Sequence, residues 1–286
     1  MQKLSILQRY KVKHWEKIIS SGKRDLANEL PRSFWSNPDE SYVEFFIKQG
    51  ANPLANIALD AKPLPEYRNP IHEVAAFNPN SNVLRELISY AGSFDYFDTM
   101  IGQLPIGCVM ANNRHAPKRE LFPDNAKVLI DFGTNLACSF QPLQTSAIHM
   151  AVTAPEDFEF VLSQCLAVKT ALEAAWGNDV VVNQTPLACA AGAGRLWACK
   201  KLVENGADVE GRNGDISPLT ACVSALTTPY RDFRYDDDLI LCAEYLINCG
   251  AQKHVFHKGI ACDTRGWIER ITVEEARSQV ESLFFH

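Results

Sequence analysis

Two short stretches of apolar residues at helical spacing, separated by glycines, form the clearest pattern in the chain, at residues 184–208. The first stretch begins at Pro186, and proline suits the first turn of a helix because its missing N–H has no intrahelical partner there. Gly192 and Gly194 then allow a tight reversal. A second helix is predicted from about Leu196 to Asn205.

The same pattern returns 32 residues later, measured from Pro186 to Pro218. The second copy opens with Ser217 before that proline, and its second helix is predicted between Leu239 and Ile247. Self-similarity at a period of this length indicates a chain built from stacked copies of one small motif. Weaker copies, supported by their common spacing, lie upstream in residues 43–50 (a half-copy), 69–92, 104–135 and 146–168.

These copies resemble the ankyrin repeat, whose pattern runs Thr-Pro-Leu-His, two alanines, a glycine turn, a second helix and Asn-Gly-Ala-Asp. Residues 185–208 follow this pattern in register, except that Ala188 stands at the histidine position. His72 and His149 resemble the structural histidines of the family, which usually tie neighbouring repeats by a hydrogen bond. The resemblance implies an all-α ankyrin-repeat solenoid of about five to six divergent helix pairs, stacked because no pair buries its apolar side alone.

The copies fill residues 41–252, and the flanking stretches lack the pattern. Residues 1–40 are expected to form an N-terminal helical cap, and residues 253–286 a C-terminal cap, because the ends of an open stack need shielding. The C-terminal cap is predicted to contain a helix around Thr272–Phe284, with Thr272 as its N-cap and two glutamates in the first turn.

Two copies carry inserts between their helices, at residues 112–125 and 226–238. Such loops lie on the surface and often carry function. The second insert contains PYRDFRYDDD from Pro229, and tyrosine and arginine are favoured in interface hot spots. Its alternative role is a solvated loop whose aspartates cap a helix beginning near Leu239. The predicted partner contacts of this insert are Tyr230, Arg231, Phe233, Arg234 and Tyr235.

The resemblance also implies a concave surface formed by the first helices of the pairs and by finger-like turns between repeats. Residues at the finger tips are expected to be exposed, with little structural duty, and therefore to be either partner contacts or plain solvated positions. These residues are Val182, Gln184, Arg212, Asn213 and Asp215.

Composition narrows the classes of function. The formal net charge of −6 argues against salt-driven nucleic-acid binding by the whole chain. Residues 1–24 are locally basic, so binding of nucleic acid or an anionic membrane by this segment is an alternative to a solvated helix face. No apolar run approaches the roughly 18 residues of a membrane span, and no secretory signal precedes the copies. With nine cysteines in no small-domain framework, we expect buried thiols and a cytoplasmic location.

Two chemical alternatives arise from the cysteines and histidines. Cys249, His254, His257 and Cys262 have zinc-type ligands, but their C-x4-H-x2-H-x4-C spacing matches no common zinc module, so no metal or other cofactor is predicted.

Catalysis would need a nucleophile and a base, which Cys108 with His115 or His149 could supply only through folding. The sequence has no serine elbow, phosphate loop or dinucleotide fingerprint, so a non-enzyme is expected.

The sequence therefore predicts a monomeric ankyrin-repeat protein that mediates protein–protein interaction. Its degenerate copies with irregular inserts resemble ankyrin proteins that intracellular bacteria deliver into host cells, which would place it in the host cytosol. The alternatives are an enzyme with a Cys–His site built into the repeats, or attachment to nucleic acid or an anionic membrane through the basic N-terminus.

Overall fold

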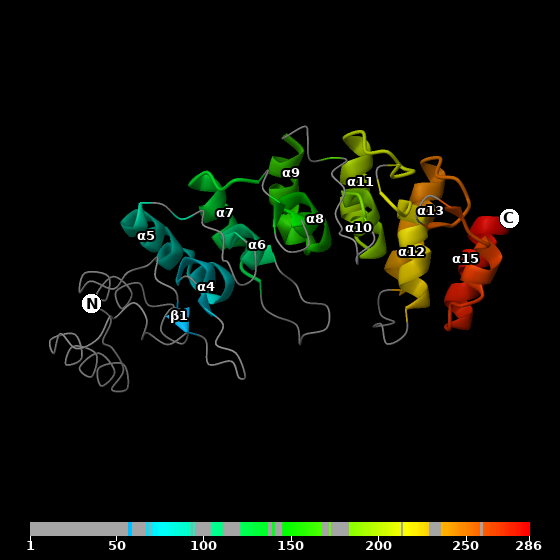
Figure 1. The fold of residues 1–286 in the computed structure, drawn as a ribbon, viewed down its shortest axis with the longest axis horizontal. Helices are drawn as coiled ribbons and strands as arrows, with labels where there is room; N and C mark the ends of the chain where they lie inside the picture. The colour runs from blue at the N-terminus through cyan, green and yellow to red at the C-terminus, as the bar shows by residue number, and fades with distance from the viewer. Residues whose placement is uncertain are drawn as a thin grey trace. The chain divides into compact units, whose positions relative to one another are not determined.

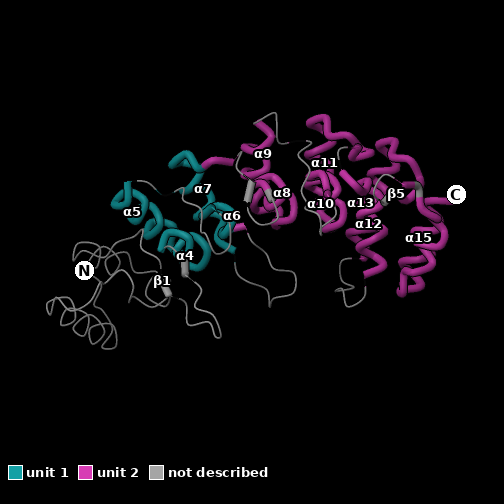
Figure 2. The backbone as a smooth tube through the Cα atoms, in the orientation of Figure 1, with its two compact units in different colours: residues 1–109, 120–134 teal, residues 110–119, 135–286 magenta. Residues whose placement is uncertain are grey.

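Paired short helices make up most of the part of the chain that the computed structural model describes (Figure 1). The chain divides into two compact units: unit 1 comprises residues 1–109 and 120–134, and unit 2 comprises residues 110–119 and 135–286 (Figure 2). The described residues are 57–58, 67–68, 70–92, 94, 104–110, 121–136, 139–140, 145–167, 172, 183–212, 214–228, 236–257 and 260–286.

Three two-stranded antiparallel ladders accompany the helices in the described residues, and each strand has only two residues. They are β1 (Ile57–Ala58) with β2 (Tyr67–Arg68), β3 (Ser139–Phe140) with β4 (Thr145–Ser146), and β5 (Phe256–His257) with β6 (Ile260–Ala261). Ladders this short build no sheet core, so the described fold is all-helical in its packing, as predicted.

Unit 1 contains α4 (Pro70–Phe77), α5 (Ser81–Ala91), α6 (Pro105–Met110) and α7 (Pro123–Asp131). The N-cap Asn80 starts α5, because its side chain accepts a hydrogen bond from the Asn82 N–H at 3.1 Å. Gly92, with φ of 68°, ends this helix in the left-handed conformation that glycine tolerates. The predicted helix from Val83 to this glycine is therefore confirmed. His72 is buried in α4.

Asn125 closes the end of α4 from the neighbouring helix. It is fully buried, and its Nδ2 donates hydrogen bonds to the carbonyl oxygens of Asn78 at 2.8 Å and Ala75 at 3.0 Å. The prediction that the insert runs to residue 125 is wrong, because α7 already begins at Pro123, a residue type favoured in the first turn of a helix. Asn125 therefore lies within α7, where its side chain donates to carbonyls at the end of α4 that lack intrahelical partners. Residues 112–120 of the insert lie outside the described residues.

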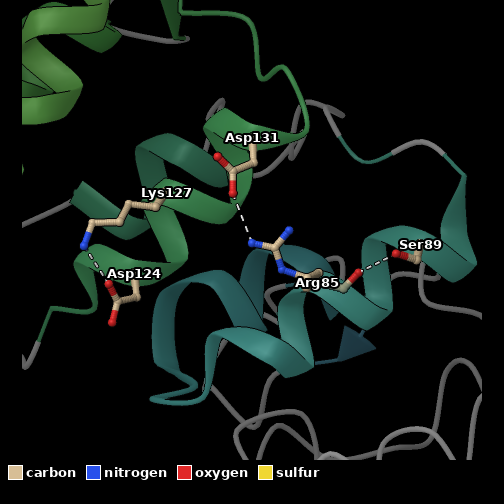
Figure 3. A network of polar contacts seen from close by, with 5 residues as sticks. All are labelled: Arg85, Ser89, Asp124, Lys127 and Asp131. Carbon is tan, nitrogen blue, oxygen red and sulfur yellow. Dashed lines mark hydrogen bonds and ion pairs between the residues drawn. The ribbon is translucent and has the colours of Figure 1, made fainter.

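Polar and aromatic contacts join the outer surfaces of α5 and α7 (Figure 3). Arg85 forms an ion pair with Asp131 at 3.0 Å, and its guanidinium carbon lies 5.8 Å from the ring centroid of Phe132. Phe94 meets that ring edge-on, with 6.1 Å between centroids. Arg85 and Asp131 are largely exposed, so this ion pair adds on the order of 1 kcal/mol or less.

Unit 2 stacks three helix pairs in chain order (Figures 1 and 2). The first helices pack in a row, α8 against α10 and α10 against α12, while α11 packs against α13 among the second helices. The pairs agree with the copies predicted from the sequence. They are α8 (Ala147–Thr153) with α9 (Glu159–Ala167), α10 (Pro186–Gly192) with α11 (Leu196–Glu204), and α12 (Pro218–Thr227) with α13 (Asp236–Asn248); a 3-10 turn, η2 (Glu156–Phe158), precedes α9.

Small residues allow the first helices to approach each other closely. The run of alanines in α10 is buried, and a Cβ on Gly192 would lie only 3.3 Å from the Cβ of Ala221 in α12. Thr185 and Ser217 are the N-caps of α10 and α12, each with its side-chain oxygen accepting a backbone N–H three residues later. The predicted Thr-Pro and Ser-Pro helix starts are therefore confirmed.

The second insert is shorter than predicted at both ends. Leu226 and Thr227 belong to α12, and the three aspartates from Asp236 form the first turn of α13 rather than preceding it. Acidic residues favour this position because the helix N-terminus carries partial positive charge. Residues 229–235, together with the predicted N-terminal cap at 1–40 and the half-copy at 43–50, lie outside the described residues.

The C-terminal stretch continues the packing order of the helix pairs before it, with one helix against the first helix of the last pair and one against its second helix. Beyond the β5–β6 ladder, α14 (Thr264–Ile268) packs against α12, and α15 (Glu274–Phe285) packs against α13. The predicted N-cap at Thr272 is wrong, because Val273 occupies that position and makes no side-chain capping bond. Glu274 and Glu275 lie in the first turn, as predicted.

Substitution of Gly211 tests the close approach between consecutive repeats. Its φ is +57°, and a Cβ there would lie 2.9 Å from Pro218 Cδ and 3.2 Å from Thr185 Oγ1. Gly206 has φ of +92° with nothing within 4 Å, so it is a matched control for backbone strain. Gly206→Ala should lose about 1–3 kcal/mol of unfolding free energy, and Gly211→Ala clearly more. Urea unfolding measures both, and equal losses would contradict the packing argument.

Candidate protein-binding surface

The first helices of unit 2 carry no acidic, lysine or arginine side chains, and their one histidine, His149, is buried. Residues 146–154, 184–194 and 216–228 contain no Asp, Glu, Lys or Arg. The second helices of the same pairs do carry charges, including Glu159, Lys201 and Glu244. We call the partly accessible side of α8 and α12 the inner face; it comprises Met150, Thr153, Ser224, Ala225 and Thr227.

The threonine hydroxyls of the inner face already donate hydrogen bonds to backbone carbonyls of their own helices. Thr153 Oγ1 donates to the Met150 carbonyl oxygen at 3.0 Å, and Thr227 Oγ1 donates to that of Ser224 at 2.9 Å. Exposed Thr228 repeats the arrangement at 3.0 Å. Because these protons are satisfied internally, covering the surface costs little desolvation of polar groups.

The finger between α11 and α12 is tied to the finger before it and to the turn after it. The Asn183 N–H donates to Asp215 Oδ2 at 2.9 Å, and the Asp215 N–H donates back to the Asn183 carbonyl at 2.8 Å. Glu210 Oε1 accepts the Gln252 N–H at 2.8 Å. The expectation that tip residues have little structural duty is therefore wrong for Asp215, whose carboxylate holds two repeats in register.

Gln184 also has a structural role. Its carbonyl oxygen lies 3.2 Å from His149 Nε2, and its side-chain Oε1 accepts the Cys189 thiol at 3.3 Å. Since a carbonyl only accepts, Nε2 carries the proton and Nδ1 accepts from the Ser146 hydroxyl at 2.7 Å. His149 thus ties α8 to the next repeat, as its resemblance to a structural histidine predicts. Ala188 is fully buried in the equivalent place in α10.

Arg212 is the most accessible of the predicted finger residues in the described chain. Its side chain is 75% exposed, and its Nη1 lies 3.6 Å from Asp208 Oδ2, so it holds the finger only loosely. The other predicted contacts at the finger tips and in the insert lie outside the described residues and stay predictions. They are Val182, Asn213, Tyr230, Arg231, Phe233, Arg234 and Tyr235.

The histidines and cysteines considered for zinc lie around the β5–β6 ladder. Among the residues that the structure describes, no three His, Cys, Asp or Glu side chains are grouped as metal ligands would be. Cys262 directs its thiol to the Ile260 carbonyl at 3.5 Å. The side chain of His257 is outside the described set, so the quartet with Cys249 and His254 is described only in part.

Burial makes several thiols poor nucleophiles. Desolvation raises the pKa of Cys165 to about 12, and it also raises the pKa of Cys222 well above its usual range. For Cys199, a hydrogen bond to Cys242 raises the pKa first and burial adds to it. The thiolate is the reactive form, so these cysteines are held in the unreactive state at neutral pH. Of the proposed catalytic residues, Cys108 is buried in α6 and His115 is not described.

Comparison with known proteins identifies the fold. No protein-family model and no curated protein sequence matches the chain. The ankyrin repeat domain of human ASB11 matches with a TM-score of 0.57 at 17% identity, covering 88% of this chain and 96% of that one. The ankyrin repeat domain of Bcl-3, a member of the IkappaB protein family, matches with a TM-score of 0.51 at 17% identity, covering 85% of this chain and 91% of that one. The chain therefore has the ankyrin-repeat fold, as predicted.

Sequence reasoning missed the uncharged inner face, although its signal is printed in the sequence. The absence of Asp, Glu, Lys and Arg from three consecutive first-helix segments becomes visible once the repeats are aligned. In the described chain, no helix is both long enough and apolar enough to cross a bilayer.

Removing the imidazole of His149 should weaken the junction between α8 and the next repeat. His149→Ala leaves the half-buried Gln184 carbonyl without this donor, so we expect a loss of about 1–3 kcal/mol in unfolding free energy. Exposed His286 is the control, and His286→Ala should change the value by less than about 0.5 kcal/mol. Chemical denaturation checks both, and an unchanged His149→Ala variant would show that the hydrogen bond contributes nothing.

The raised pKa of Cys165 predicts a loss of stability in alkali. Between the ordinary thiol value of 9.0 and about 12, the unfolded chain releases this proton while the folded chain keeps it. Stability present below pH 9 therefore falls as pH rises, by up to about 1.4 kcal/mol per pH unit for this thiol. In reductant, Cys165→Ala should flatten the pH dependence of the unfolding free energy between pH 9 and 10.5. Val161→Ala, at another buried position of α9, should lower stability but keep the slope.

Proposed function

We propose that the protein binds another protein through the inner face and the adjacent finger of unit 2. The observation that carries the proposal is the absence of charge from three consecutive first helices whose partner helices are charged. Ankyrin-repeat scaffolds typically serve protein–protein interaction, which supports the same assignment.

The physical properties of the inner face favour association. Met150, Ala225 and the methyl groups of its threonines gain from being removed from water, and their hydroxyls need no new partner. Arg212, on the finger that precedes α12, supplies a residue type enriched in interface hot spots. The proposed contact surface thus combines apolar helix residues with a charged finger residue, as specific interfaces combine an apolar core with a polar rim.

A charge placed on the inner face should disrupt binding. Ala225→Glu puts an unpaired carboxylate into the proposed contact, so we expect at least a tenfold loss of affinity, about 1.4 kcal/mol or more. Leu241→Glu is the matched control, because Leu241 is 46% exposed on the second helix α13. Partners captured by the wild type are identified by mass spectrometry, purified and titrated against both variants.

Equal binding by the wild type and Ala225→Glu, or equal loss in both variants, would reject the inner face as the contact surface. A third variant without residues 229–235 tests the predicted contacts of the insert. It leaves the observed ends of α12 and α13 intact. Unfolding curves confirm that each variant is folded before its binding is compared.

Three further expectations stay predictions. Delivery into a host cell and the cytosolic location are not tested by the fold. The catalytic alternative, a Cys–His site within the repeats, would need a nucleophile other than the three thiols whose pKa is raised. Binding of nucleic acid or an anionic membrane depends on residues 1–24, which lie outside the described residues; it would weaken steeply with added salt.

A further inference from the structure

Three dipeptides in the sequence place a serine or threonine directly before proline, and the structure gives them different surroundings. They are Thr185-Pro186, Ser217-Pro218 and Thr228-Pro229. Thr185 and Ser217 are buried N-caps, and their side-chain oxygens accept backbone N–H groups of the helices that they start. Thr228 is instead exposed and follows the last residue of α12. Of the three hydroxyls, only that of Thr228 is therefore accessible to an enzyme.

Thr228 also has the backbone conformation and the sequence context of a kinase acceptor. Its φ of −72° and ψ of 121° are extended, as expected for a residue before proline. Arg231 follows three positions later, and neither of the other two dipeptides has a basic residue at that position. Protein kinases distinguish their substrates partly by such charge patterns. Thr228 thus combines exposure, extended backbone and a neighbouring charge, which are the features that a proline-directed protein kinase selects.

The hydrogen bond that the Thr228 hydroxyl makes is no obstacle to its modification. Oγ1 donates to the Ser224 carbonyl oxygen at 3.0 Å, and this contact is exposed. Water can replace an exposed hydrogen bond, so releasing the hydroxyl costs little. Phosphorylation of Thr185 or Ser217 would instead remove a helix cap and expose a buried side chain, which costs more.

We propose that Thr228 is the acceptor for a proline-directed protein kinase, and that phosphate at this position prevents a partner protein from binding to the inner face. Thr228 directly follows Thr227, which belongs to the inner face. The effect on binding rests on the proposed function, because it acts on the same surface. The modification itself does not depend on that function.

The reaction transfers the γ-phosphoryl group of MgATP to Thr228 Oγ1. A bond forms between Oγ1 and the γ-phosphorus, and the bond between that phosphorus and the oxygen bridging it to the β-phosphorus breaks. ADP leaves, and the catalytic aspartate of the kinase accepts the hydroxyl proton. This chain supplies the acceptor oxygen, and the kinase supplies the remaining groups.

Phosphate at Thr228 opposes association in two ways. It brings a charge of about −1.5 to −2 at pH 7 to a segment, residues 216–228, that contains no Asp, Glu, Lys or Arg. Taking this charge out of water under a partner is unfavourable unless the partner pairs with it. The phosphate also lies at the C-terminal end of α12, where the partial negative charge of the helix repels it.

The first test identifies the modified residue in the full-length chain. The protein is incubated with MgATP and a purified proline-directed kinase that favours a basic residue three positions after the acceptor, and whose activity is confirmed on a peptide substrate. Mass spectrometry should find one main phosphorylated residue, Thr228, and Thr228→Val should lose it. Ser278→Ala is the control, because Ser278 is exposed but precedes no proline, and it should keep the phosphate on Thr228. An unmodified Thr228, or a main site elsewhere, would overturn the proposal.

The second test measures the effect on binding. A partner captured by the wild type is titrated against unmodified and phosphorylated chain, and we expect at least about a tenfold loss of affinity that phosphatase reverses. Kinase treatment of Thr228→Val should leave its affinity unchanged. Equal binding before and after phosphorylation rejects the proposal. If Ala225→Glu still loses the partner in that case, the proposed function stands; if Ala225→Glu also binds normally, both are rejected.

Discussion

Close packing between the first helices of consecutive repeats is the constraint on which the rest of the structure depends. A helix pair of this length has one apolar side that it cannot bury by itself, so it folds only against its neighbours. Gly192 and the alanines of α10 bring the backbones of α10 and α12 so near that a single added Cβ at Gly192 would be tight. This close spacing requires small side chains in the first helices. The same helices carry no charge on the inner face.

Specific polar contacts hold the repeats in register once they are packed. Asn125 satisfies the last carbonyls of α4, His149 reaches the Gln184 carbonyl, and Arg195 Nε donates to the Thr153 carbonyl at 3.3 Å. In each case a side chain from one repeat serves the backbone of another. Buried or half-buried contacts of this type penalise misalignment, because a displaced repeat leaves a polar group without its partner. The exposed pair of Arg85 and Asp131 adds little by comparison.

Local signals explain which parts of the fold could be predicted from sequence. Thr185 with Pro186, and Ser217 with Pro218, mark helix starts through backbone chemistry confined to a few residues, so those boundaries were found. The prediction that Asp215 and Gln184 have little structural duty was wrong because their partners, Asn183 and His149, belong to other repeats. These residues are distant in the sequence and come together only when the repeats stack. The predicted insert ends at Asn125 and Asp238 were wrong, although Pro123 and the aspartates from Asp236 are themselves local signals of a helix start.

The hydrogen bonds between consecutive turns determine how a partner would encounter this protein. Asn183 with Asp215, and Glu210 with Gln252, couple each turn to the next through backbone N–H groups. A loop held in this way loses its conformational freedom when the chain folds, so little ordering entropy remains to be lost on association. The surface should therefore select partners by shape and change little on contact, and differences in affinity among them should appear mainly as differences in dissociation rate.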